Sequence, residues 1–596
     1  MVDGSTTAWR DGWYVVNSNV TIGNLVTVSG TVHLILADNA SLTVNGGIKV
    51  AEGNSFSVYA QSVGKNVGTL TATGENGAGI GGGSWGNAGT ITINGGSVTA
   101  TGGYNQAGIG GGDQSSGGTV TISGGNVTAT GGQEAAGIGS GFEGSGGNIT
   151  IHGGSITATG GGPAAGIGSG SSGSYDNITI NGGTVTATGG QEAAGIGSVA
   201  NGSYGNITIN GGTVKATGGD YAAGIGGGDG VSYGNITING GNVTTTGGDY
   251  AAGIGSGQDS SGGNITIHGG SVTAIGGNLA AGIGGGFKGS GGNITINGGN
   301  VTATGADEGA GIGDGSGGSG GSFTTGTDGH ALIFANGGIS DTSNRDSWSG
   351  IIFEGDTGEV YKDQTLQENI EIPSGKTLTV PENTTLTVKD GVTLTNNGTI
   401  TGNGTLDSEG NLVGSGTVAQ TITNNLQKDS AVSVTVSPSP ATYGSKVSIT
   451  ATISRATNAI TLAAENQNQV EFFVGTDSNK TSLGTADVKG DTATLPDVEI
   501  SQGKGFAFGE NTITAAYSGS MGLKPQTDST RLTVKGDLKD AIVTVKGNYL
   551  YTNSPIIPEV SVTWNGTQLT KDTDYTVDYT DNTNAGKATV TVTGTG

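Results

Sequence analysis

The stretch GGNITINGGNVTATG, residues 291–305, decides the fold, because close copies of it recur along half of the chain. It contains two short runs in which Ile, or Val and Ala, alternate with Thr, and a Gly-Gly pair lies between the runs. Alternation with a period of two predicts strands with the apolar side chains on one face and Thr on the other. Glycine pairs give the backbone the freedom that a tight corner requires. This segment therefore predicts two short strands joined by a corner.

The tripeptide Gly-Ile-Gly sets the period of the repeat at 29 residues. A strict period without insertions is typical of a solenoid, and the high Gly content excludes a helical one. Each unit has a third apolar segment, such as Ala136 and Ile138 on either side of Gly137. Three short strands per unit predict an all-β fold, a right-handed parallel β-helix with 29-residue coils. The central isoleucines are Ile80, Ile109, Ile138, Ile167, Ile196, Ile225, Ile254, Ile283 and Ile312.

Stacking of the coils places equivalent residues above one another, about 4.8 Å apart. One outward column contains only threonines, from Thr92 to Thr295. A corner column is rich in asparagine, and stacked Asn side chains can hydrogen-bond along the axis. That column reads Asn94, Ser123, His152, Asn181, Asn210, Asn239, His268 and Asn297.

Changes in the repeat pattern and in the spacing of the predicted strands divide the chain into three domains. We expect the β-helix to span residues 1–427, and two β-sandwich or Ig-like modules to follow at 428–535 and 536–596, where strands recur at sandwich spacing. Within the β-helix, the regular repeats occupy about 75–320, a cap occupies 1–74, and irregular coils occupy 328–427. Terminal coils must cover apolar surface, so we expect Trp9 and Trp13 to close the N-terminal end.

Composition limits the partners of the protein. A net charge of -25 argues against nucleic acid, because few cations are present to neutralise phosphates. No run of 18 apolar residues exists, so we expect no membrane insertion. The absence of Cys excludes disulfides and thiolate metal sites. The first 13 residues lack the features of a secretion signal, so we expect a piece of a longer secreted protein without its signal or anchor.

Several segments resemble known families of bacterial surface proteins. The AGIGGG motif at 223–228 resembles the Gly-rich β-helix regions of large clostridial surface proteins, and ITINGGTVTAT at 178–188 is similar to bacterial polysaccharide-binding β-helices. VEFFVG and NTITAAYSGS, within 429–535, resemble bacterial Ig-like repeats. DTDYTVDY and DNTNAGKATVTVTG, within 536–596, resemble short wall-protein modules. These resemblances imply an extracellular cell-surface or cell-wall adhesin that contacts a glycan or a host or cell-surface glycoprotein.

Two positions in each unit vary while the rest is repeated, and specificity can lie at variable positions on a fixed scaffold. Aromatic residues and carboxylates gather there, and such groups suit sugars, whose C–H faces stack on rings and whose hydroxyls bond to polar groups. The alternative is that these rings fold over the corners and shield the coil edges. The candidate ligand-binding residues are Tyr204, Tyr221, Tyr233 and Tyr250 with Asp220, Asp229 and Asp249.

Other functions have weaker support in the sequence. Outward T-A-T motifs resemble an ice-binding face, although Lys215 and Ile275 interrupt the columns. Catalytic residues are not expected, because carboxylates such as Glu134 and Glu192 are two coils apart. No cofactor is expected, although isolated Ca²⁺ at Asp-bearing corners is left open. A purely structural rod, and a non-catalytic part of a secreted glycan-degrading enzyme, remain as alternatives to an adhesin.

Overall fold

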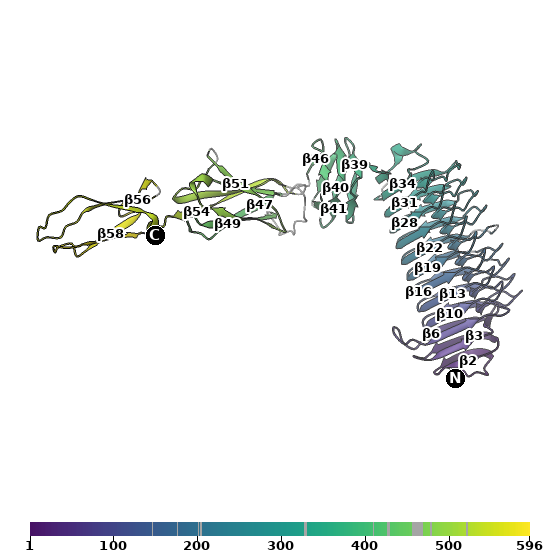
Figure 1. Cartoon of the computed structure of the whole chain (residues 1–596). Coiled ribbons are helices and arrows are strands. Elements are labelled where there is room, and N and C mark those ends of the chain that lie inside the picture. Colours follow the sequence, from purple (N-terminus) through teal and green to yellow (C-terminus); the bar gives the residue numbers. More distant parts are fainter. Residues whose placement is uncertain are drawn as a thin grey trace.

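The computed structural model describes residues 1–145, 147–175, 177–200, 202, 205–326, 330–408, 410–425, 429–455, 469–476, 479–519, 523–564 and 566–595. Its regular elements are β-strands and the short 3₁₀ turns η1 (Arg345–Ser347), η2 (Gln502–Lys504) and η3 (Leu538–Asp540). A long coil of stacked strands begins at the N-terminus, and three smaller β units follow it (Figure 1). The fold is all-β and its largest part is a parallel β-helix, as the repeat predicted.

Each regular coil contributes one strand to each of three parallel sheets. Equivalent residues pair coil on coil, so that Thr150 lies opposite both Thr121 and Thr179. The four-residue strands of the first sheet are β9 (Thr90–Ile93), β12 (Thr119–Ile122), β15 (Asn148–Ile151), β18 (Asn177–Ile180), β21 (Asn206–Ile209), β24 (Asn235–Ile238), β27 (Asn264–Ile267), β30 (Asn293–Ile296) and β33 (Ser322–Thr325).

The second and third sheets have the same register. The second is β7 (Thr69–Thr73), β10 (Ser97–Thr101), β13 (Asn126–Thr130), β16 (Ser155–Thr159), β19 (Thr184–Thr188), β22 (Thr213–Thr217), β25 (Asn242–Thr246), β28 (Ser271–Ile275), β31 (Asn300–Thr304) and β34 (Leu332–Asn336). The third has two-residue strands: β8 (Ile80–Gly81), β11 (Ile109–Gly110), β14 (Ile138–Gly139), β17 (Ile167–Gly168), β20 (Ile196–Gly197), β23 (Ile225–Gly226), β26 (Ile254–Gly255), β29 (Ile283–Gly284) and β32 (Ile312–Gly313).

The N-terminal coils extend the same sheets with strands of more varied length. They are β1 (Ala8–Val16), β2 (Val20–Ile22), β3 (Val26–Leu36), β4 (Ser41–Val44), β5 (Ile48–Val50) and β6 (Ser55–Ala60). Trp9 is fully buried and its ring lies 5.6 Å from that of Tyr14 and 5.7 Å from that of Phe56. Trp13 is 61% exposed and stacks on His33, so of the two expected capping rings only Trp9 closes the core.

The first β-helix ends in strands that are buried on both faces. Strand β34 pairs with β31, and its Ile333 and Ala335 continue the core of the first β-helix. Its Leu332 and Phe334 take outward positions, where the preceding coil has Asn300 and Thr302, and they belong to a second hydrophobic core. One strand therefore completes one core and begins the next.

Strand β35 (Gly350–Glu354) extends this joint. Its Ile352 faces the first core, whereas Ile351 and Phe353 face the second. The ring of Phe353 stacks on that of Phe334 with the centroids 4.8 Å apart. Strand β36 (Thr357–Tyr361) then returns antiparallel to β35 and pairs with β39 (Thr377–Val380) of a smaller β-helix. Residues 1–427, expected as one β-helix, thus contain two cores.

The coils of the second β-helix are shorter than the 29-residue coils of the first. The hydroxyl of Thr417, for example, donates a hydrogen bond to that of Thr399, which lies one coil and 18 residues earlier. Its three sheets contain β36, β39 (Thr377–Val380), β42 (Thr399–Gly402) and β45 (Thr417–Val418); β37 (Gln364–Leu366), β40 (Thr385–Val388), β43 (Thr405–Ser408) and β46 (Thr423–Asn424); and β38 (Ile370–Ile372), β41 (Thr393–Asn396) and β44 (Asn411–Val413). Leu378, Leu386 and Leu394 are among the fully buried residues of its core.

Two further β units complete the chain. Two sheets packed around a third core form a sandwich: β47 (Ser430–Ser437), β49 (Lys446–Arg455) and β52 (Thr492–Glu499) face β48 (Ala441–Thr442), β54 (Gln526–Lys535), β53 (Gly509–Tyr517), β50 (Gln469–Val474) and β51 (Thr481–Asp487). The last unit has β55 (Ile542–Lys546), β56 (Glu559–Trp564), β57 (Thr567–Gln568), β58 (Tyr575–Thr580) and β59 (Thr589–Gly594). Trp564 of this unit packs against Tyr443 and Phe508 of the sandwich.

Candidate functional site

The Gly-Ile-Gly segment brings the two variable turns of each coil together. The backbone N–H of Ala223 donates to the carbonyl of Gly227 across 2.9 Å, so the chain bends sharply around the buried Ile225. Gly226 has φ of +132°, and a Cβ at this residue would lie 2.0 Å from the carbonyl oxygen of Gly255 in the next coil. Only Gly fits this position, because both the backbone angle and the close approach exclude a side chain.

Backbone bonds between coils then link the two turns. The N–H of Gln258 donates to the carbonyl of Tyr221 across 3.1 Å, and that of Phe287 donates to the carbonyl of Tyr250 across 2.8 Å. The two turns, which the sequence suggested as separate corners, therefore form one line along the solenoid. We call it the variable edge: residues 220–221 and 229–230 in one coil, and their equivalents at intervals of 29 residues.

Two stacked rings and a third, tilted ring lie in contact along the variable edge. The ring centroids of Tyr221 and Tyr250 are 5.8 Å apart and the planes differ by 7°. The ring of Phe287 lies 5.6 Å from that of Tyr250 and is tilted by 51° to it, and the ammonium group of Lys288 lies 5.0 Å from the Phe287 centroid. All three rings are half-buried. Because parallel rings cover one another's faces, mainly ring edges and hydroxyl groups can meet a ligand, together with the face of Tyr221 that points away from Tyr250.

The turn backbone, and not the aromatic side chain, explains the unusual conformation of these tyrosines. Tyr221 and Tyr250 have φ of +63° and +64°, a left-handed region that aromatic residues rarely adopt. Glu192 and Leu279, at the same position in other coils, have φ of +57° and +58°. The scaffold thus imposes one backbone geometry on this position and accepts different side chains there.

Acidic side chains lie beside the stack. Asp220 and Asp249 are exposed, and Asp249 accepts a hydrogen bond of 3.2 Å from the side chain of Asn278. Asp229 is half-buried, and its pKa is raised above the ordinary value by partial burial and then by the charges of Glu192 and Asp259. Within the described ranges, no three His, Cys, Asp or Glu side chains are placed to hold a metal ion.

Tyr233, expected in the ligand row, is instead part of the core and cannot stack on a ligand. It is 2% exposed, and its hydroxyl donates to the carbonyl of Gly291 across 2.9 Å. Burial raises the pKa of the Tyr233 phenol. Gly262 and Gly291 occupy the same position one and two coils later, and glycines leave space for the ring. Tyr175, at the same position two coils earlier, is also buried, and Tyr204 lies outside the described residues.

Sequence reasoning did not place Phe287 beside Tyr250, because the two belong to different turns. The spacing of the two residues, 37 positions, could have predicted the contact, because the second turn of one coil is hydrogen-bonded to the first turn of the coil before it. The backbone N–H groups of Phe142 and Ser171 donate in the same way to the carbonyls of Asn105 and Glu134. The outward threonine pairs do lie on the second sheet, where Lys215 and Ile275 interrupt their columns.

A family model described as a beta helix repeat matches the chain nine times, and all the matches lie in the first β-helix. The matched residues are 66–84, 91–113, 120–142, 149–171, 178–203, 207–229, 236–258, 265–287 and 294–316. Comparisons with curated proteins and with solved structures find no match. The fold and the family model agree that this part of the chain, the first β-helix, is built from β-helix repeats. No helix among the described residues is long and apolar enough to cross a membrane.

Proposed function

We propose that the protein is an extracellular bacterial surface protein that binds carbohydrate at the variable edge of its first β-helix. The second β-helix, the sandwich and the last unit act as a stalk, and no catalytic step is assigned to the chain. The observation that carries the proposal is the stack of Tyr221 and Tyr250, with exposed Asp220 and Asp249 beside it. The rest of each coil is repeated, so these turns are where one coil differs chemically from the next.

The chemistry of this edge fits a hydroxyl-rich polymer. Carboxylates accept hydrogen bonds from sugar hydroxyls, and a phenol both donates and accepts. The half-buried ring of Tyr221 would offer the face that points away from Tyr250 to the C–H groups of one sugar ring, and Tyr250 and Phe287 follow it along the axis of the solenoid. The acidic balance of the chain, -25, disfavours polyanions such as nucleic acids. The expected partner is therefore a neutral glycan or the glycan of a cell-surface glycoprotein.

The test is a glycan array probed with the whole chain and with a Tyr221→Ala/Tyr250→Ala double variant. If each aromatic contact contributes about 1 kcal/mol, the double variant binds roughly 30-fold more weakly. Tyr104→Ala is the matched control, because Tyr104 is 63% exposed on the same edge and lies outside the stack. Tyr233→Phe is a second control, which removes a buried hydroxyl and leaves the edge intact. A double variant that binds with wild-type affinity contradicts the proposal.

A structural rod is the second candidate function, and the joint between the β-helices favours it. Strands β34 and β35 are buried on both faces, which resists bending at the point where a spacer would be weakest. This function predicts that the whole chain binds no glycan, mucin or wall polymer in the array.

A further inference from the structure

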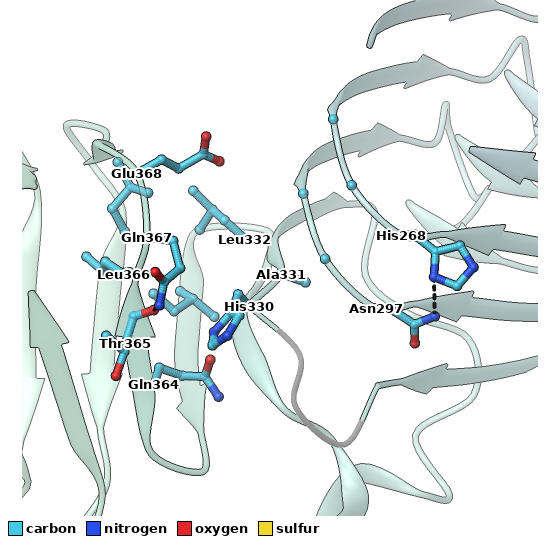
Figure 2. A pocket seen from close by; sticks show the side chains of 16 residues that line it. His268, Asn297, His330, Ala331, Leu332, Gln364, Thr365, Leu366, Gln367 and Glu368 are labelled. Carbon is cyan, nitrogen blue, oxygen red and sulfur yellow. Dashed lines mark hydrogen bonds between the residues drawn. The ribbon is translucent and has the colours of Figure 1, made fainter. Parts of the chain in front are cut away.

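A cleft of about 390 Å³ lies where the two β-helices meet (Figure 2). One wall is formed by the glycine turns His268–Gly270 and Asn297–Gly299, in the last coils of the first β-helix. The opposite wall is formed by β37 and the residues after it, at the start of the second β-helix. The two walls come from separate cores, so an occupant of the cleft would bridge the two β-helices.

The floor of the cleft is the open end of the second core. Leu332, Leu366 and Ile370 are 6%, 7% and 8% exposed, whereas deeper residues of this core such as Leu386 and Leu394 are fully buried. The reason is the topology of the joint. Strand β36 connects the second β-helix to β35, but β37 and β38 are the first strands of their sheets, and no strand of the first β-helix pairs with them. The core is therefore not closed on this side.

The cleft is lined by amides, by the imidazoles of His268 and His330, and by one carboxylate. Gln364 is 5% exposed, and its amide nitrogen donates to Ser349 Oγ and to the carbonyl of Tyr361, which leaves its Oε1 to accept from an occupant. Gln367 is exposed, and its Nε2 donates to the carbonyl of Thr365 across 3.4 Å at the open edge of β37. Glu368 is exposed beside it. Neither Lys nor Arg lines the cleft.

We propose that this cleft binds one or two units of a neutral saccharide that carries an N-acetyl group. The acetamido methyl would cover the apolar floor, its N–H would meet the Gln364 carbonyl, and ring hydroxyls would bond to Gln367 and Glu368. An anionic ligand is disfavoured, because Glu368 is negatively charged and the other polar lining residues, which include His268 and His330, contain no Lys or Arg. An extended peptide is less well suited, because β37 offers an edge of only 3 residues. This site shares no residue with the variable edge and does not depend on the function proposed there.

The experiment is calorimetric titration of the whole chain with the disaccharide of N-acetylglucosamine, and with cellobiose as a comparator that lacks the N-acetyl groups. We expect the N-acetylglucosamine disaccharide to bind at least about tenfold more tightly than cellobiose. Cellobiose lacks both the apolar contact of the acetamido methyl and the hydrogen bond from the acetamido N–H. Glu368→Ala should weaken binding about fivefold, and Gln367→Trp should abolish it by filling the cleft. Glu382→Ala is the matched control, because Glu382 is exposed on another turn of the same β-helix.

Each other outcome overturns the proposal in a defined way. No binding of the N-acetylated disaccharide, or unchanged binding by both cleft variants, removes the site. Equal binding of cellobiose removes the role of the N-acetyl group. Binding of a short leucine-containing peptide in place of either sugar assigns the cleft to peptides. The Tyr221→Ala/Tyr250→Ala variant should retain this binding in full, which separates this site from the variable edge.

Discussion

The side-chain nitrogen of Asn210 donates a hydrogen bond of 2.7 Å to the side-chain oxygen of Asn181, from one coil to the next. Asn239 donates in turn to Asn210 across 2.7 Å, and Asn181 bonds to His152 across 3.1 Å. Asn181 and Asn210 thus both donate and accept, and the side chains form a ladder along one corner of the solenoid. This confirms the ladder that the Asn column predicted.

A second ladder runs along the opposite end of the first sheet. It begins at Asn148 and continues through the first residue of each N-I-T-I strand to Asn293, with bonds of 2.8 to 3.1 Å. Ser322 extends it by one coil. The sequence contains this column too, but these asparagines begin strands directly after turns, where they resemble ordinary turn residues. Both ladders are exposed, so they add register and stiffness to a fold whose core supplies most of the stability.

Asn210→Ala should lower the free energy of unfolding by about 1 to 2 kcal/mol, because it removes two side-chain hydrogen bonds at an exposed corner. Urea denaturation followed by circular dichroism measures the change. Asn242→Ala is the control, since Asn242 is an exposed asparagine at the start of β25 in the second sheet and lies outside both ladders. Equal effects of the two substitutions would show that the ladder contributes no stability.

Ile196→Asp should destabilise the first β-helix by more than about 4 kcal/mol. Ile196 is fully buried between Ile167 and Ile225, so the new carboxylate would be an unpaired charge in the core. Thermal unfolding checks this expectation. Thr188→Asp introduces the same charge at an exposed position of the same coil and should have little effect. A thermal midpoint of Ile196→Asp close to that of Thr188→Asp contradicts an inward orientation of the Gly-Ile-Gly isoleucines.

Deletion of residues 197–225 should leave a folded β-helix that is shorter by one coil. The deletion joins Ile196 to Gly226, and Ile196 pairs with Ile225 one coil later, so every strand keeps an equivalent neighbour. Deletion of residues 197–211 should instead disrupt stacking, because it shifts inward side chains out of register. Small-angle scattering and circular dichroism distinguish the two products. Equal folding of both deletion variants would exclude a 29-residue structural unit.

Asp229→Asn should stabilise the protein near neutral pH. The pKa of Asp229 is raised in the folded state, so the ionised carboxylate opposes folding at every pH above that pKa. This cost disappears as the pH falls to the ordinary value of 3.8, where the carboxyl becomes protonated in the folded and unfolded chains alike. The difference in stability between variant and wild type should therefore be positive at about pH 7 and absent at about pH 3. A difference that grows toward acid would have the wrong sign.

The sequence alone determined the strands, their inward and outward faces and the length of the coil. Alternation is a local property, and a strict period transfers the geometry of one coil to all the others. The inward Ile178 and Ile180 and the outward Thr179 could be assigned without a structure, and they are buried and half-buried as expected.

Only the tertiary structure decided which tyrosines face solvent. Tyr233 and Tyr221 lie in turns of similar composition, yet Tyr233 enters a space left by glycines of later coils, whereas Tyr221 stacks on Tyr250 at the edge. The joint at β34 was decided in the same way, since Phe334 would be an exposed residue if the second β-helix did not pack on it. In both cases the burial of a side chain depends on residues in another coil or another core, and local alternation contains no information about them.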